Sequence, residues 1–107
     1  MTVERRVHAR VPFAGRAYLT YDGRCRAEEV VNLSREGLQL HSGARLRPGK
    51  PVKVFLPLPH AGGFRLCLLK GEVVRRVRGR EASLGIALLP GETDTRALLA
   101  EYVTAAA

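Results

Sequence analysis

The sequence predicts a small, mostly β domain, an antiparallel barrel or sandwich of about six short strands that is followed by one helix. Apolar and polar residues alternate along several short segments, which is the pattern of half-buried strands. Clusters of Gly, Pro, Asn and Asp separate these segments, and Asp22-Gly23 is a typical signal for a tight hairpin. The chain has 107 residues, enough for one domain with one hydrophobic core.

We therefore expect residues 1–107 to form a single domain in three parts. Residues 1–11 form a flexible arm, because few of them can be anchored in a core. Residues 12–90 form the β region, and residues 92–104 form the C-terminal helix. The expected strands cover residues 13–21, 24–33, 37–41, 52–58, 64–78 and 82–89.

Interruptions of the alternation predict local irregularities. The run Glu28-Glu29-Val30-Val31 suggests a bulge or a register change in the second strand. Pro57 and Pro59 mark an end or an edge of the fourth strand, because proline cannot donate to a sheet ladder. The fifth strand is expected to bend at Gly71, and Gly85 lies on a strand face where another group can approach closely.

The first strand should bury Ala17, Leu19 and Tyr21 on one face, and the second should turn Cys25 and Ala27 inward. Cys25 and Cys67 are interpreted as small buried apolar residues and not as a disulfide. Cysteine pairs with metal-ligand spacing are absent, and the three histidines are scattered along the chain. We therefore expect no metal site.

Thr93 is a suitable N-cap for the C-terminal helix, and Asp94 is favourable in its first turn. An apolar stripe at helical spacing follows, made of Leu98, Leu99, Tyr102 and Val103. This stripe should lie on the barrel or on a partner, so the chain is expected to be a monomer or a weak dimer.

The formal net charge is +8, and arginine far outnumbers lysine. This excess favours a polyanionic partner: a nucleotide, a nucleic acid or an acidic protein surface. No signal peptide is evident, and no apolar run approaches the ~20 residues of a membrane span. A cytoplasmic protein without membrane insertion is expected. The sequence offers no pair of nucleophile and base and no set of metal ligands, so no enzyme, catalytic residue or cofactor is predicted.

The segment Asn32-Leu33-Ser34-Arg35-Glu36-Gly37 is predicted to form a tight polar turn between two strands. Asn and Ser side chains can fix such a turn through hydrogen bonds to nearby backbone groups. Gly37 is expected to take a positive φ, which a residue with a Cβ adopts only at a cost of about 1–2 kcal/mol. Taken alone, this is a structural hairpin turn that could also present an amide and a hydroxyl to a ligand.

Three arginines, Arg5, Arg6 and Arg10, gather in the N-terminal arm. Pro12 disfavours a helix here, because it pushes the preceding residue toward extended geometry. Arginine binds phosphate bidentately, stacks on bases and pairs with the O6/N7 edge of guanine. Taken alone, the arm is a solvated basic tail. With the turn, it could wrap an anion of nucleotide size.

The two segments together resemble the PilZ family, whose motifs are RxxxR and (D/N)xSxxG. RxxxR matches Arg6 to Arg10, and the second motif matches Asn32, Ser34 and Gly37. The resemblance covers nearly the whole chain. It implies a six-stranded antiparallel β-barrel of the split-barrel type with a C-terminal helix and a flexible arm. It also implies a receptor for the bacterial second messenger cyclic di-GMP, bound between arm and turn and signalling by ordering the arm.

The resemblance implies a ligand site made of Arg5, Arg6, Arg10, Asn32, Ser34, Arg35 and Gly37. The arginines of RxxxR would contact phosphates and guanines, and Asn32 and Ser34 would bond a guanine edge or a phosphate. Gly37 would hold the turn, and Arg35 is a secondary candidate. In the family, an arginine directly before RxxxR, here Arg5, goes with binding of a stacked pair of dinucleotides. One or two ligands per chain remain open.

Two other functions stay in view. One is an adaptor of the PilZ type that acts by protein contact without a ligand. The other is a basic nucleic-acid-binding barrel, which is disfavoured because aromatic residues make up only 6% of the chain and tryptophan is absent. For a receptor, the output would pass to a protein effector in trans, because no effector domain is recognised in the chain.

Overall fold

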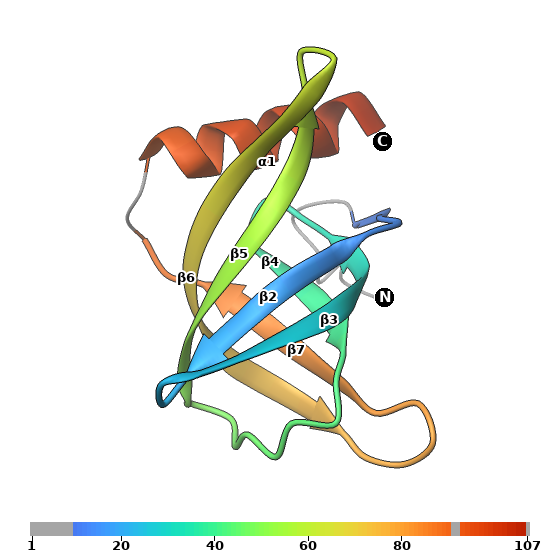
Figure 1. Ribbon diagram of the computed structural model, residues 1–107, viewed down its shortest axis with the longest axis vertical. Coiled ribbons are helices and arrows are strands. Elements are labelled where there is room, and N and C mark those ends of the chain that lie inside the picture. The colour runs from blue at the N-terminus through green and yellow to red at the C-terminus, as the bar shows by residue number, and fades with distance from the viewer. Residues whose placement is uncertain (1–9, 91–92, 107) are drawn as a thin grey trace, which may run out of the picture.

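The computed structural model describes residues 10–90 and 93–106. They form the strands β1 (Val11–Pro12), β2 (Arg16–Tyr21), β3 (Arg24–Leu33), β4 (Gly37–His41), β5 (Pro51–His60), β6 (Gly63–Val77) and β7 (Ser83–Leu88), then the helix α1 (Thr93–Ala106). The strands make one antiparallel sheet in the order β1-β3-β2-β5-β6-β7-β4, and pairing of β3 with β4 closes it. Strands β2 to β7 are thus a closed six-stranded barrel (Figure 1), as predicted.

The core fills the barrel with aliphatic side chains from alternate strand positions. Ala17 and Leu19 of β2 are completely buried, as the period-two pattern predicts. The helix α1 lies across the barrel beside β5 and β6 (Figure 1), and buries Leu99 and Val103. The apolar stripe of the helix therefore packs on the barrel. This helix lacks the length and hydrophobicity that crossing a bilayer would require.

The first predicted strand is interrupted. Its observed part, β2, begins at Arg16, and the short β1 precedes it along the same edge of β3. Phe13 lies in the gap and turns its ring into the core, where it meets Tyr102 of α1 edge-on with a centroid distance of 5.5 Å. Backbone hydrogen bonds to β3 continue across the gap, from the Phe13 N–H to the Val31 carbonyl at 3.4 Å and from the Val30 N–H to the Gly15 carbonyl at 2.9 Å. Residues 13–15 lie opposite only the two residues 30 and 31, so the interruption is a bulge in the first predicted strand.

The hairpin of β5 and β6 is longer than predicted, because β5 continues through Pro57 and Pro59 to His60. Beyond Phe55, β5 pairs only with β6, so both prolines lie on a free edge where a missing N–H costs little. The two residues of the turn, 61 and 62, have positive φ values of 48° and 79°, which suit a tight hairpin turn. Strand β6 curves strongly (Figure 1), and its register shift lies between Val73 and Arg75, beyond Gly71.

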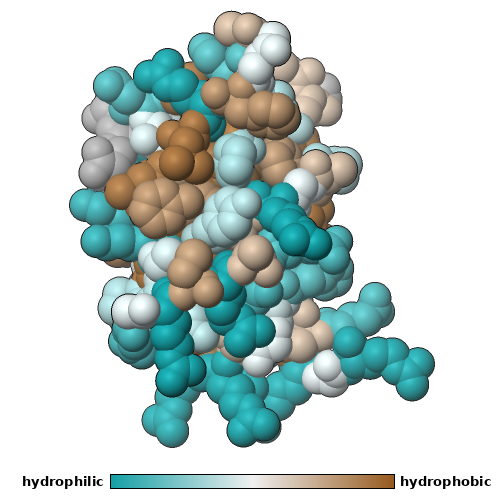
Figure 2. Space-filling model, in the orientation of Figure 1, coloured by the Kyte–Doolittle hydropathy of each residue, from teal (hydrophilic) through white to brown (hydrophobic). Residues whose placement is uncertain are grey.

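The outward face of this hairpin is apolar and exposed. Phe64 is 77% exposed and Leu66 is 63% exposed, and the register sets them opposite Pro59 and Pro57. Figure 2 shows the resulting hydrophobic surface on the upper part of the molecule, over β5 and β6. An apolar patch on an exposed face is typical of a contact surface.

The two cysteines occupy different environments, and the prediction that both are buried is wrong for one of them. Cys67 is 1% exposed, whereas Cys25 is exposed, as is Ala27. Both cysteines are free thiols. The predicted irregularity in β3 explains the error. The register of β3 on β4 shifts between Val30 and Asn32, so the residues before the shift face the opposite way from a continuous alternation.

We predict that the thiols react at very different rates. Burial raises the pKa of the Cys67 thiol, an effect that Arg65 partly offsets, so Cys67 carries little thiolate and is also shielded. In native buffer a chromogenic disulfide reagent should consume one thiol rapidly and the second only after unfolding. Cys25→Ser should remove the rapid phase. A rapid phase that persists in this variant would contradict the placement of Cys67 in the core.

Candidate functional site

The turn between β3 and β4 is held by Ser34. The Ser34 N–H donates to the Gly37 carbonyl at 2.9 Å, which closes the turn. The Ser34 hydroxyl accepts from the Glu36 N–H at 3.2 Å and lies 3.4 Å from the Gly37 carbonyl, to which it can donate. Ser34 thus fixes the shape of the turn, and Arg35 lies exposed at its tip.

Gly37 is required for a different reason from the one predicted. It is the first residue of β4 and is not among the residues with positive φ. A Cβ built on Gly37 would lie 2.4 Å from the carbonyl oxygen of Ile86 in β7. The Leu88 N–H also donates to the Glu36 carbonyl at 2.8 Å, which draws the turn onto β7. The glycine therefore permits close contact of two backbones.

Asn32 belongs to a polar row on the outer face of the barrel. Its amide donates to the Gln39 side chain at 3.0 Å, and Gln39 donates to the Ser83 hydroxyl at 3.4 Å. The registers continue this row from Asn32 through Gln39 and Gly85 to Arg75, across β3, β4, β7 and β6. Because Gly85 has no side chain, the outer surface of the barrel is depressed between Gln39 and Arg75.

The structure brings Arg10 to the turn. Strand β1 pairs antiparallel with β3, with Val11 opposite Leu33 and Pro12 opposite Asn32. Arg10 comes directly before Val11, so extending this register by one residue places Arg10 opposite Ser34. Arg10 is exposed. The last arginine of the RxxxR motif and the start of the turn motif thus lie together. Arg5 and Arg6 lie outside the described residues.

Sequence reasoning missed Gln39 and Arg75 as parts of this surface. Gln39 could have been found, because a hairpin that pairs Leu33 with Leu38 also pairs Asn32 with Gln39. Arg75 could not, because the register shift in β6 sets which face it occupies. The surface presents amide and guanidinium groups around the glycine, which suits an anion carrying a flat heterocycle. Within residues 10–90 and 93–106, no group of three or more His, Cys, Asp and Glu side chains could hold a metal ion.

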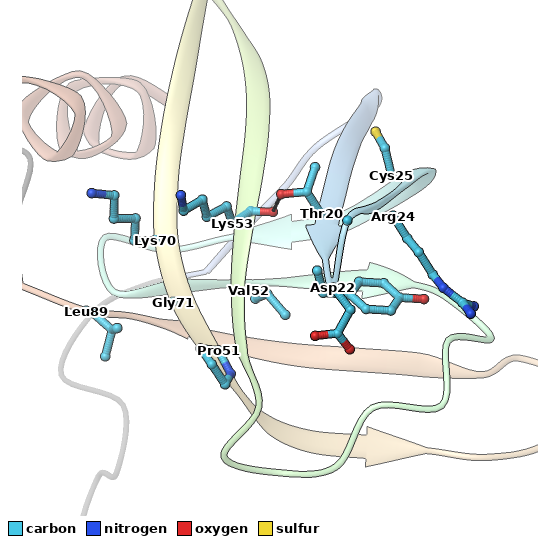
Figure 3. A pocket seen from close by; sticks show the side chains of 12 residues that line it. Thr20, Asp22, Arg24, Cys25, Pro51, Val52, Lys53, Lys70, Gly71 and Leu89 are labelled. Atoms are coloured by element: carbon cyan, nitrogen blue, oxygen red, sulfur yellow. Dashed lines mark hydrogen bonds between the residues drawn. The ribbon is translucent and has the colours of Figure 1, made fainter.

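A separate hollow of about 650 Å³ lies between the β2–β3 hairpin and strands β5 and β6 (Figure 3). Its wall includes Thr20, whose hydroxyl donates to the Lys53 carbonyl at 3.1 Å, and Asp22, which pairs with Lys50 at 2.8 Å. None of the predicted site residues lines it. The hollow and the polar row are therefore distinct surfaces.

Comparison with known families identifies the family of the chain. The family model described as "PilZ domain" matches residues 4–105. The chain belongs to the PilZ domain family. The match includes both motif segments and extends into α1. No curated protein matches this PilZ domain.

Solved structures with the same fold are similar to this PilZ domain at low identity. The Bacillus subtilis inhibitor of motility (MotI/DgrA) aligns with a TM-score of 0.83 at 15% identity, over 96% of this chain and 51% of that chain. Borreliella burgdorferi PlzA, solved in complex with c-di-GMP, gives 0.70 at 15%, over 92% and 41%. The PilZ domain of Escherichia coli YcgR with c-di-GMP gives 0.66 at 14%, over 96% and 92%. This chain thus spans about half of the first protein and less of the second.

We predict that Gly37→Ala destabilises this PilZ domain by about 1–3 kcal/mol, because the new methyl group would force β4 and β7 apart. Gly85→Ala is the matched control. Its Cβ would lie 3.5 Å from the Cβ of Arg75, an ordinary contact, so its effect should stay within about 0.5 kcal/mol. Urea unfolding measures both values. Equal stability of the two variants would show that the Gly37 contact does not constrain the fold.

Proposed function

We propose that this PilZ domain is a receptor for cyclic di-GMP, which binds on the outer face of the barrel between the N-terminal arm and the 32–37 turn. The observation that carries the proposal is the pairing of β1 with β3, which leads Arg10 to the start of that turn. Membership of the PilZ family supports it, as do the structures of PlzA and of the YcgR PilZ domain, both solved with c-di-GMP.

In this proposal the arm supplies positive charge. Arg6 and Arg10 contact phosphate oxygens and a guanine edge or face, since a guanidinium can serve as a bidentate donor and as a stacking plane. Arg5 adds a further cation, which offsets the phosphates of a second, stacked dinucleotide. Two ligands per chain are therefore expected. Arg35, exposed at the tip of the turn, is a secondary contact for phosphate.

The turn and the polar row supply the recognition surface. Asn32 and Ser34 bond a guanine edge or a phosphate, while Gly37 holds the turn against β7. We further propose that a purine lies over Gly85, where the missing side chain lowers the surface beside Gln39 and Arg75. The Asn32–Gln39 hydrogen bond at 3.0 Å holds the amide in a set direction. Such support by a neighbouring side chain reduces the entropy that binding costs.

The expected affinity is micromolar or tighter. A charge-assisted hydrogen bond contributes about 1.5–3 kcal/mol, and base stacking about 1–3 kcal/mol for each base. Ordering the arm costs about 2–5 kcal/mol. A remainder near −8 kcal/mol corresponds to a micromolar Kd.

Binding, and not catalysis, is the proposed activity, and the ordered arm is the proposed signal. The output then passes to a protein effector in trans inside the bacterial cytoplasm. The apolar outer face of β5 and β6 supports such a partner, because Phe64 and Leu66 are exposed there. Lys53 and Lys70 lie opposite each other on the same pair of strands, so acidic groups beside an apolar area would suit this face. The same face also supports the second candidate function, an adaptor that acts by protein contact without ligand.

Calorimetric titration with cyclic di-GMP tests the receptor. We predict saturable binding with a micromolar or lower Kd and a stoichiometry of two, whereas GTP and cyclic di-AMP bind weakly or not at all. Arg10→Ala should weaken binding by about tenfold or more, the loss of one charge-assisted contact. Arg24→Ala, which removes an exposed arginine from the far end of β3, is the matched control and should bind normally. Absence of heat with folded wild-type protein would favour the adaptor.

A second variant tests the position of the purine. Gly85→Val should leave the domain folded, because the side chain would point outward and its Cβ would lie at ordinary contact distances, 3.5 Å from the Cβ of Arg75 and 3.8 Å from the Cγ2 of Val74. It should weaken cyclic di-GMP binding by at least about tenfold, since the branched side chain occupies the space proposed for the base. Unfolding curves and calorimetry on the same sample separate the two effects. Wild-type affinity in this variant would place the base elsewhere.

A further inference from the structure

A second hollow lies at the opposite end of β4 from the 32–37 turn. It has a volume of about 470 Å³, is open to solvent, and is bordered by the segment after β4, the end of β6 and the loop that leads to β7. Its charged lining consists of the arginines Arg45, Arg76 and Arg78. Small-molecule sites typically measure roughly 300–1,000 Å³, so the space suits a ligand of nucleotide size or smaller. Figure 2 shows hydrophilic side chains projecting from this lower end of the molecule.

The three guanidinium groups are not neutralised by the part of the chain that the structure describes. No ion pair within 4.0 Å joins any of them to a described carboxylate, whereas Arg26 pairs with Glu28 elsewhere on the barrel. Like charges gathered around one cavity repel each other, and a bound anion would remove that repulsion. Arg76 is partly buried, which strengthens its interaction with an anion relative to a fully solvated side chain.

Hydrogen bonds tie the segments that form the walls of the hollow to one another. The Ser42 N–H donates to the Ala82 carbonyl at 3.1 Å, which ties the segment after β4 to the loop before β7. The Ser42 hydroxyl accepts from the Ala44 N–H at 3.1 Å and shapes the chain just before Arg45. At Gly43 and Gly79, a Cβ would meet no atom within 4 Å, so the backbone there borders open space. A ligand could approach this backbone as well as the arginines.

We propose that this hollow binds a small anion carrying two or more linked phosphate groups. A guanidinium presents a planar fork that matches one phosphate bidentately, so three arginines that line one cavity suit more than one phosphate group. The site shares no residue with the proposed cyclic di-GMP surface. It therefore does not depend on that proposal, and each can fail without the other.

The test is calorimetric titration of the whole chain at physiological salt with sodium tripolyphosphate, pyrophosphate, orthophosphate and ATP. We expect one saturable site, with pyrophosphate and tripolyphosphate binding at least about tenfold more tightly than orthophosphate. The ATP arm distinguishes a nucleoside polyphosphate from an inorganic one, because only the former would gain affinity over tripolyphosphate. Either source supports the proposal.

The variant Arg76→Gln/Arg78→Gln should weaken tripolyphosphate binding by at least about tenfold while cyclic di-GMP titrates as in wild type. The variant Arg16→Gln/Arg24→Gln removes the same charge from exposed positions elsewhere and should bind tripolyphosphate normally. Thermal melts verify that both variants fold. Equal losses in the two variants, or no saturation by millimolar tripolyphosphate, would overturn the proposal. So would stronger binding to a single-stranded oligonucleotide with a steep salt dependence, which would identify a nucleic-acid surface.

Discussion

The contact between Gly37 and the Ile86 carbonyl is the constraint on which both the barrel and the proposed site depend. Strand β4 has only five residues, and its pairing with both β3 and β7 closes the sheet. Its first residue must pass so near to β7 that a Cβ would lie 2.4 Å from the Ile86 oxygen. The turn that carries Asn32, Ser34 and Arg35 is therefore set by the closure of the barrel, and its rigidity comes from the fold itself.

Two register shifts determine which side chains reach the outer face. In β3, Val30 is buried and Asn32 pairs outward with Gln39, because the intervening residue is extra to the ladder. In β6, Val73 is buried and Arg75 pairs outward with Gly85, again after one extra residue. Without these shifts, the strict alternation would point Asn32 and Arg75 into the core. Both polar groups reach the same row because each bulge reverses the phase of its strand.

The same shifts mark the limit of prediction from the sequence. The existence and the order of the six strands and the helix can be predicted from the alternation of apolar and polar residues and from the turn residues. The motif residues can be predicted from the resemblance to the family. The inward face of β3 could not be predicted, because the phase that Leu33 sets does not continue through the bulge to Cys25. The sequence predicts an irregularity in β3, but the position of the bulge decides which residues face inward. That position depends on the pairing of β3 with β4. The motif identified Gly37 as important, but the contact that requires a glycine there is with Ile86 of β7, nearly fifty residues away in the sequence.

The narrow barrel also explains why the proposed ligand needs the arm. A barrel of six strands has an interior that side chains fill, here large residues such as Leu19, Leu40 and Leu84, so it offers no internal cavity for a dinucleotide. A dinucleotide must therefore bind on the outer face of the barrel. This face is convex, so it can contact only one side of the ligand. The remaining sides must be covered by another segment, and β1 leads the chain toward the turn at Arg10. In the receptor that we propose, closure of the arm over the ligand and tight binding would therefore be one event, and the proposed signal would arise from binding itself.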